Sequence, residues 1–217
     1  MRRQAGKTAL QRAKCSVFIA TSLDGFISRT DGSIDWLNKA NLLMPPGEDC
    51  GYAQFMSTVD ALVMGRNTYD QVRTFDPWLY GLTPIVVLTS HPLDLLQPPQ
   101  VSGTVSAVSA SSEPPEAVIE RLTAEGKRHL YVDGGRTVQS FLDAGLIDEL
   151  IITTIPVLLG SGRPLFANAG SSGGGDVELA HVATRTFDFG FVQSKYRVKR
   201  GGDEDDEDEE GKRQEQA

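Results

Sequence analysis

In Ala61-Leu62-Val63-Met64-Gly65-Arg66-Asn67-Thr68-Tyr69, a glycine directly follows a short apolar run. The same arrangement returns in His129-Leu130-Tyr131-Val132-Asp133-Gly134-Gly135-Arg136-Thr137. Each stretch predicts a strand, a tight turn and the start of a helix. Glycine in such a turn lets the backbone approach a ligand closely, and the N–H groups of a helix start attract phosphate. Together the two turns predict a dinucleotide site on one sheet, although either turn alone also fits an ordinary connection.

Apolar, β-branched runs alternate with helical patterns along most of the chain. This alternation is typical of a mostly parallel sheet that helices cover on both faces, so we predict an α/β fold. The predicted strands are residues 16–22, 61–64, 84–89, 105–108, 129–132 and 150–155, followed by an antiparallel pair at 177–186 and 191–198. The predicted helices are residues 51–59, 68–73, 114–125 and 137–144.

The charge of the chain is concentrated at its ends. The 217 residues carry a net charge of −8, and an acidic run fills residues 203–210. We predict a basic, disordered extension at 1–14, one domain at 15–200 and a disordered acidic tail at 201–217. A transit segment in the first part and a docking role for the tail remain alternatives. A chain trimmed to residues 15–200 is expected to keep its fold.

Composition also excludes several classes of function. The domain between the charged ends is mildly acidic, which does not favour nucleic-acid binding. No apolar run approaches the roughly 20 residues of a membrane span. The two cysteines, Cys15 and Cys50, form no CxxC pair, and the three histidines are widely spread, so we predict no metal site. A reducing cytoplasm is the expected location.

Four ordered stretches resemble the signatures of one known family. They are Ser16–Ile27, Asp60–Tyr69, Tyr131–Gly135, and Asp148–Thr153 with Pro156–Gly162. On these motifs the chain resembles the dihydrofolate-reductase-like superfamily, and within it a stand-alone reductase domain of the bacterial riboflavin-biosynthesis enzymes. The resemblance implies a three-layer fold whose mostly parallel central sheet has antiparallel C-terminal strands and helices on both faces. The zinc-deaminase signature that often precedes this domain is missing.

The resemblance implies NADPH as the cofactor. Arg66 is the expected phosphate contact, with a surface ion pair as the alternative. Thr89 and Ser90 would contact the 2′-phosphate or form only a turn, and Asp133 is expected to face a backbone amide. The residues implied to bind the cofactor are Ala20, Gly65, Arg66, Thr68, Thr89, Ser90, Gly134, Gly135, Arg136 and Thr137.

Four further residues are candidates for the substrate side. Asp24 and Asp49 are the catalytic candidates, with a turn residue and a helix-start carboxylate as their respective alternatives. Trp36 would cap the substrate or belong to the core. Thr153 matches a position that touches the substrate or its bound water. The loop at residues 160–163 could contact a substrate phosphate or simply turn the chain.

These residues indicate an NADPH-dependent reductase of a pterin-like or ribosylamino-pyrimidine substrate. The alternative is a catalytically silent NADP-binding or regulatory module of the same fold. A classical Rossmann dehydrogenase is disfavoured because no Gly-x-Gly-x-x-Gly follows the first strand. We also expect a homodimer, because residues 150–155 and 187–198 offer more apolar strand surface than a sheet edge should leave bare.

Overall fold

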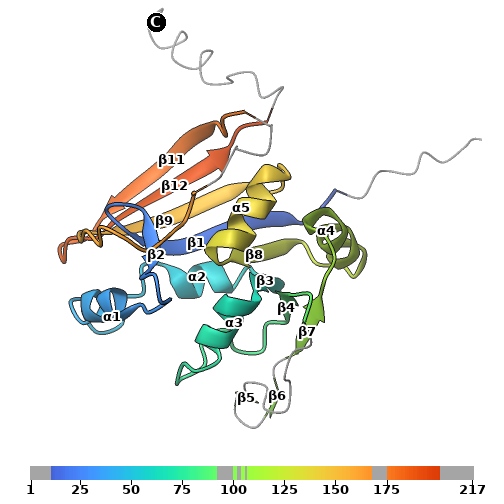
Figure 1. Cartoon of the computed structure of the whole chain (residues 1–217), viewed down its shortest axis with the longest axis horizontal. Coiled ribbons are helices and arrows are strands. Elements are labelled where there is room, and N and C mark those ends of the chain that lie inside the picture. Colours follow the sequence, from blue (N-terminus) through green and yellow to red (C-terminus); the bar gives the residue numbers. More distant parts are fainter. Residues whose placement is uncertain (1–10, 92–99, 102–103, 106, 168–174, 201–217) are drawn as a thin grey trace, which may run out of the picture.

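The structure is a computed structural model that describes residues 11–91, 100–101, 104–105, 107–167 and 175–200. Its centre is an eight-stranded sheet in the order β11-β12-β9-β1-β8-β3-β4-β7 (Figure 1). The strands are β1 (Lys14–Ser22), β3 (Ala61–Gly65), β4 (Ile85–Leu88), β7 (Val108–Ser111), β8 (His129–Asp133), β9 (Glu149–Ile155), β11 (Leu179–Thr186) and β12 (Val192–Val198). Two small pairs stand apart: β2 (Phe26–Ser28) with β10 (Arg163–Pro164), and β5 (Gln100–Val101) with β6 (Thr104–Val105).

The strands from β9 to β7 run parallel, whereas β12 is antiparallel to β9 and β11 is antiparallel to β12. The predicted α/β class is therefore confirmed, including the antiparallel strands at the C-terminal end. The helices are α1 (Asp35–Asn41), α2 (Tyr52–Met56), α3 (Arg66–Val72), α4 (Pro115–Ala124) and α5 (Gly135–Asp143).

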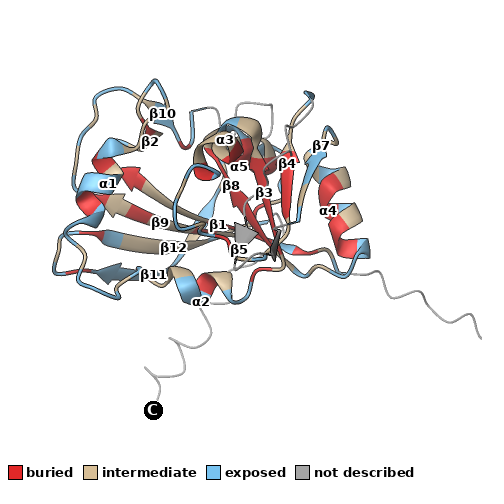
Figure 2. Ribbon diagram, turned by 90° about the horizontal axis from the view of Figure 1, so that it is seen from below, coloured by how far each residue is buried: buried red, intermediate tan, exposed pale blue. Residues whose placement is uncertain are grey.

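Helices cover both faces of the sheet because its central strands are apolar on both sides. In β8, Leu130 and Val132 belong to the core that α4 and α5 close. Tyr131, between them, points into the second core, which α2 and α3 close. This period of two is the alternation of a strand, and the central strands are accordingly buried along their length (Figure 2). A third core joins α1 to the ends of β9 and the β11–β12 hairpin.

One predicted strand and one further helix differ from the sequence analysis. The predicted strand at 105–108 overlaps β7 at Val108 alone, and Val105 belongs to β6. The sequence repeats Val-Ser-Ala at 105–107 and 108–110, so the pattern fits either register, and pairing of Val86 with Ser109 fixes it. Helix α1 is an element that the sequence analysis did not predict. It is short, and it forms because Trp36 and Ala40, one turn apart, are both buried in the third core.

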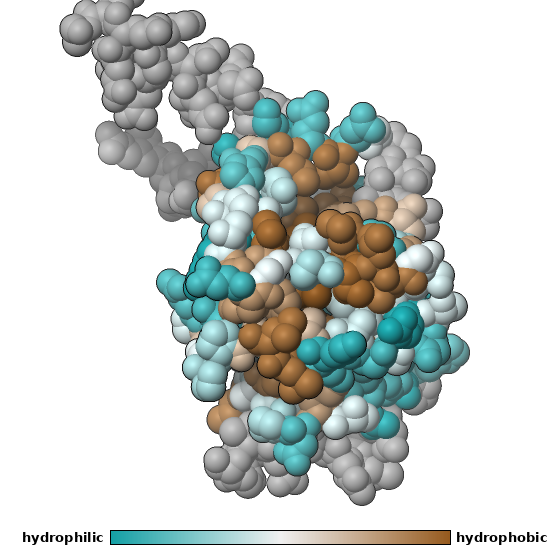
Figure 3. Space-filling view, turned by 90° about the vertical axis from the view of Figure 1, so that its left-hand side faces the viewer, coloured by the Kyte–Doolittle hydropathy of each residue, from teal (hydrophilic) through white to brown (hydrophobic). Residues whose placement is uncertain are grey.

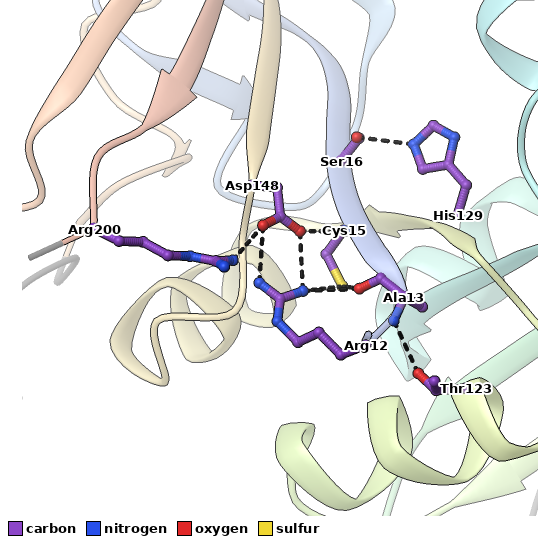
Figure 4. A network of polar contacts seen from close by, with 8 residues as sticks. All are labelled: Arg12, Ala13, Cys15, Ser16, Thr123, His129, Asp148 and Arg200. Carbon is purple, nitrogen blue, oxygen red and sulfur yellow. Dashed lines mark hydrogen bonds and ion pairs between the residues drawn. The ribbon is translucent and has the colours of Figure 1, made fainter. Parts of the chain in front are cut away.

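The N-terminal end of β1 is anchored at Asp148 (Figure 4). Its carboxylate accepts two hydrogen bonds from Arg12, both of 2.9 Å, and one of 2.8 Å from the Cys15 N–H. Arg200, beyond the end of β12, donates to the same carboxylate. Ala13 is fully buried. The fold thus already includes residues 12–14, which the predicted domain boundary assigned to the extension.

The remaining parts of the two predicted tails, residues 1–10 and 201–217, lie outside the described residues. Among the described residues, no helix has the length and apolar character needed to cross a membrane.

Candidate active site

The two glycine turns lie side by side at the carboxyl edge of the sheet, where the neighbouring strands β3 and β8 end. Gly65 precedes α3 and Gly134 precedes α5. A Cβ atom on Gly65 would lie 3.0 Å from the Thr137 hydroxyl, and one on Gly134 would overlap the Thr68 hydroxyl. Each glycine therefore faces the threonine of the other turn, and the two turns form one packed unit.

This unit presents two adjacent helix starts. The residues at the N-cap positions of α3 and α5, Gly65 and Gly134, have no side chain that could cap these helices. The first N–H groups of a helix have no partner inside the helix and carry a partial positive charge, which suits a phosphate group. Gly134 has a φ of +89°, a conformation that favours glycine.

Gly135 lies against the small β2–β10 pair. A Cβ on it would lie 3.0 Å from the Pro164 carbonyl and 3.1 Å from Ile27 Cδ1. The missing side chain thus makes room for the β2–β10 pair rather than for open space. Arg136 is exposed at the start of α5, and Thr137 is buried.

Three residues that the resemblance implies to bind the cofactor lie just after the ends of β3 and β4: Arg66, Thr89 and Ser90. Gly65 pairs with Leu88, so Thr89 and Ser90 follow at the same edge. The Arg66 Nε–H donates to Asp70 over 2.7 Å, one turn along α3, which is the ion pair of the alternative interpretation. Thr89 Oγ1 accepts the His91 N–H over 3.1 Å, as in a turn. Arg66 and Thr89 thus both have partners within the protein, and their contact with a phosphate of the cofactor stays a prediction.

A cleft of about 380 Å³ opens between α3 and the loop that follows β2. Arg163 reaches it from β10, and its guanidinium group packs against Gly32. The cleft brings a cationic group beside the helix that carries Arg66. Its lining residues are Asp31, Gly32, Ser33, Asn67, Asp70, Gln71 and Arg163.

Asp24 connects the loop after β1 to the loop after β9 by hydrogen bonds. Its carboxylate accepts the Ser22 hydroxyl at 2.6 Å, the Gly160 N–H at 2.7 Å and the Leu159 N–H at 3.1 Å. The hydrogen bond from Ser22, assisted by the two backbone bonds, lowers the pKa of Asp24. A carboxylate held in this way is a poor proton donor and a good structural link between the loops after β1 and β9.

Asp49 caps α2. Its two carboxylate oxygens accept the N–H groups of Gly51 and Ala53, each over 2.8 Å. The bond from Ala53 is the main cause of the lowered pKa of Asp49. The geometry is that of a helix-start carboxylate, the alternative that the sequence left open.

Trp36 and Thr153 are both buried. Trp36 is 5 % exposed in the third core, and its Nε1–H has no hydrogen-bond partner among the described residues. Thr153 Oγ1 accepts a 3.0 Å hydrogen bond from Gln193 Nε2, which also donates to the Cys50 carbonyl. Gln193 therefore ties β9 to the segment before α2 at the point where Thr153 was expected to meet substrate.

Ala20 borders the gap between the ends of β1 and β8. The ladder of β1 with β8 stops at Ser16, and the Tyr131 hydroxyl then donates to the Phe18 carbonyl over 2.7 Å. Ala20 follows on the same side of the strand. The chain leaves β1 toward α2 on one face and leaves β8 toward α5 on the other, so this gap is a topological switch point, where open α/β sheets bind ligands.

Asp133 is a site residue for which the sequence analysis predicted only a contact with a backbone amide. It is buried, and its Oδ1 accepts the Gly134 N–H over 2.8 Å, which agrees with the expected backbone contact. Its Oδ2 accepts the Tyr80 hydroxyl over 3.2 Å. Burial raises the pKa of Asp133 to about 6. An acidic residue ending the buried strand 129–133 is the signal that could have identified it.

Comparison with known proteins identifies the family. The family model described as the RibD C-terminal domain matches residues 13–192. The chain belongs to the RibD C-terminal domain family. It is 40% identical over 156 residues to the uncharacterized protein YwjB of Bacillus subtilis, with 70% of this chain and 82% of that protein aligned. YyaP of the same organism is 27% identical over 196 residues, with 86% and 96% aligned.

Solved structures agree with this assignment. A putative riboflavin biosynthesis protein from Shewanella sp. PV-4 is 37% identical, with a TM-score of 0.74, covering 86% of this chain and 99% of that one. A deaminase/reductase from Thermotoga maritima shares the fold, with 14% identity, a TM-score of 0.61, and coverage of 87% of this chain and 57% of that one. The resemblance to the riboflavin-biosynthesis reductases and the dihydrofolate-reductase-like fold are confirmed, and RibD-family membership supports an oxidoreductase. Within the described ranges, no group of three acidic, His or Cys side chains could hold a metal ion.

Proposed function

We propose that this RibD-family protein is an NADPH-dependent reductase of a ribosylamino-pyrimidine or pterin-like substrate. One observation carries the proposal: the two glycine turns pack against each other at the ends of β3 and β8, and the buried Asp133 ends β8 beside the switch point between β1 and β8. A phosphate-binding edge and a carboxyl that can hold a proton near neutral pH are the two parts that a hydride-transfer site needs.

The residues present fit the cofactor. The starts of α3 and α5, with glycine at their N-cap positions, would hold the pyrophosphate, and the Ala20 backbone would face the nicotinamide end. Arg66, Thr89 and Ser90 would contact the 2′-phosphate, with Asp70 giving up or sharing its ion pair. Bound there, NADPH would supply the hydride that reduces a C=N bond of the substrate.

The accompanying proton is assigned to Asp133. Reduction of a C=N bond places a hydride on carbon and a proton on nitrogen. The raised pKa of Asp133, caused by burial, keeps a proton on this carboxyl up to a pH of about 6. The pKa values of Asp24 and Asp49 are lowered by hydrogen bonds, so these groups are ionised at neutral pH and their oxygens serve the backbone. Asp133 therefore suits the role first predicted for those two carboxylates.

The test is a binding and turnover screen of the full chain. NADPH is titrated against the protein by calorimetry, and oxidation of NADPH is followed at the nicotinamide band with a panel of pterins and ribosylamino-pyrimidines. The proposal expects binding and turnover, and loss of turnover with retained binding in Asp133→Asn. Binding without any oxidation would favour the catalytically silent module, and no binding would reject both.

A homodimer is the second part of the proposal, on another surface than the strands named from the sequence, because residues 150–155 lie in β9, inside the sheet between β12 and β1. Figure 3 shows apolar side chains gathered on the end of the molecule formed by α1 and the loops after β1 and β9. The exposed leucines of these segments are Leu23, Leu42, Leu43 and Leu158. Covering them against a second copy would remove apolar surface from water. Light scattering that gives only the 23.5 kDa monomer at micromolar concentration would contradict this part.

A further inference from the structure

The segment between α3 and β4 places the hydroxyl group of Tyr80 beside Asp133. Tyr80, in the middle of this segment, is 5 % exposed, and its Oη lies 3.2 Å from Asp133 Oδ2. The Trp78 ring packs edge-on against Tyr80 with centroids 5.1 Å apart, and Trp78 Nε1–H donates to the Gly81 carbonyl over 3.0 Å. The Tyr80 ring also lies 6.4 Å from that of Tyr131. These contacts hold the hydroxyl in place.

Asp133 accepts hydrogen bonds from two donors, and among the described residues no basic group affects its pKa. Burial, the Gly134 N–H and the Tyr80 hydroxyl determine its pKa. Three phenols interact electrostatically with Asp133: Tyr80 from the segment after α3, Tyr52 from α2 and Tyr131 from β8. Burial, with the charge of Asp133, raises the pKa of all three, so each stays protonated. Of the three, only Tyr80 donates to Asp133, because Tyr131 donates to Phe18 and the Tyr52 hydroxyl has no partner among the described residues.

We propose that Tyr80 is a positioning residue for the proton-holding carboxyl of Asp133. The Gly134 N–H fixes Oδ1 and the Tyr80 hydroxyl fixes Oδ2, so the carboxyl keeps one orientation. Once the proton has left Asp133, both donors stabilise the carboxylate that remains. Without the Tyr80 hydroxyl, the buried carboxyl would keep its proton to a higher pH, because its ionised form would lose a hydrogen-bond donor. This inference rests on the proposed function, because it gives the carboxyl a proton to exchange.

The test compares Tyr80→Phe with Tyr52→Phe in the full chain. Both variants delete one buried phenol oxygen beside Asp133, but only the first removes a hydrogen bond to it. Protonation of Asp133 is followed by the infrared band of its carboxylic acid, assigned by its absence in Asp133→Asn. We expect the midpoint of Tyr80→Phe to move up by about one pH unit, and that of Tyr52→Phe to move much less. An unchanged midpoint in Tyr80→Phe overturns the proposal.

Turnover gives an independent readout. In an active enzyme, the pH profile of kcat should move upward with the infrared midpoint in Tyr80→Phe, while the KM for NADPH stays unchanged. A shifted midpoint in a protein without turnover would keep the positioning role of Tyr80 and reject the reductase. If Tyr80→Phe does not fold, Trp78→Phe loosens the packing of Tyr80 and keeps its hydroxyl. An upward shift of the midpoint there supports the proposal, and an unchanged midpoint rejects it.

Discussion

Gly134 and Thr68 are complementary across the two turns: the hydroxyl of Thr68 occupies the space that a side chain on Gly134 would need. The reciprocal contact joins Gly65 to Thr137. The glycines thus do more than allow a tight turn, because they let two helices start against each other. A displacement of one turn must displace the other.

Gly134→Ala should destabilise the protein by about 2 kcal/mol or more, because the φ of +89° strains an alanine and the new Cβ collides with Thr68. Thr68→Ala in the same chain removes the colliding oxygen and should restore part of the loss. Urea denaturation of the two single variants and the double variant measures this coupling. Purely additive effects would show that the turns are not packed as described.

NADPH should bind more tightly than NADH by roughly 1–3 kcal/mol, because Arg66 and the Thr89–Ser90 pair can contact the extra phosphate. Arg66→Gln should reduce the difference between the binding free energies of NADPH and NADH, since it removes the cationic group. Asp70→Asn is the matched control: it removes the ion-pair partner and keeps Arg66, so the preference should persist. Calorimetric titration with both cofactors decides, and equal dissociation constants in the parent would contradict the prediction.

Asp49→Asn should cost about 0.5–1 kcal/mol of stability and leave turnover near that of the parent, because Asp49 caps α2 and an amide keeps only one acceptor oxygen. The measurements are thermal denaturation and kcat across pH 5–8. Asp133→Asn is the comparison, for which a loss of about 10²–10⁴-fold is expected. A large loss of kcat in Asp49→Asn would return the catalytic role to this residue.

Stability should depend on pH through Asp133. Its folded pKa of about 6 lies above the ordinary value of 3.8, so the folded state binds the proton more tightly than the unfolded state. Below pH 4 the group contributes nothing, and stability falls as the pH rises from 4 to 6, by about 3 kcal/mol at most. Asp133→Asn lacks this loss. In urea denaturation at pH 4, 5, 6 and 7, the free energy of unfolding of the variant should therefore rise relative to that of the parent as the pH increases. A difference that stays constant with pH would contradict the raised pKa.

Residues 11–200 should form a stable unit, whereas a protein beginning at residue 15 should melt several degrees lower. The shorter chain loses the Arg12 hydrogen bonds to Asp148 and the buried Ala13. Thermal denaturation of both proteins measures the difference. Arg12→Gln in the longer chain is the control that separates the ion pair from the burial of Ala13. Equal melting temperatures would restore the boundary first predicted at residue 15.

The sequence identified those features that a short stretch specifies alone. The run Ala61–Met64 is apolar on both sides and ends in glycine, which requires a buried strand and a turn. The two glycine turns therefore stood out as the centre of the site. The repeated Val-Ser-Ala of β7 is the opposite case, because its local pattern is compatible with two registers and pairing with β4 decides between them.

Roles that depend on distant partners could not be predicted. Tyr80 lies 53 residues from Asp133 in the chain, and no local sequence pattern indicates their hydrogen bond. Asp24 accepts hydrogen bonds from Leu159 and Gly160, which are 135 and 136 positions away in the chain. Its local context, an Asp-Gly turn, therefore did not indicate these two contacts. The resemblance predicted which residues lie at the carboxyl edge, but the distinction between holding a ligand and holding the fold required the three-dimensional contacts.

The Asp148 carboxylate has a consequence for the connectivity of the fold. Because Arg12 and Arg200 both bind it, the two ends of the described chain meet at one point, at the opposite edge of the sheet from the glycine turns. A short linker from residue 200 to residue 11 could close the chain into a circle, and new ends could then be opened in an exposed loop. A circular permutant of this kind would keep every strand neighbour of the sheet. The order in which the strands are connected is thus separable from the arrangement that builds the site.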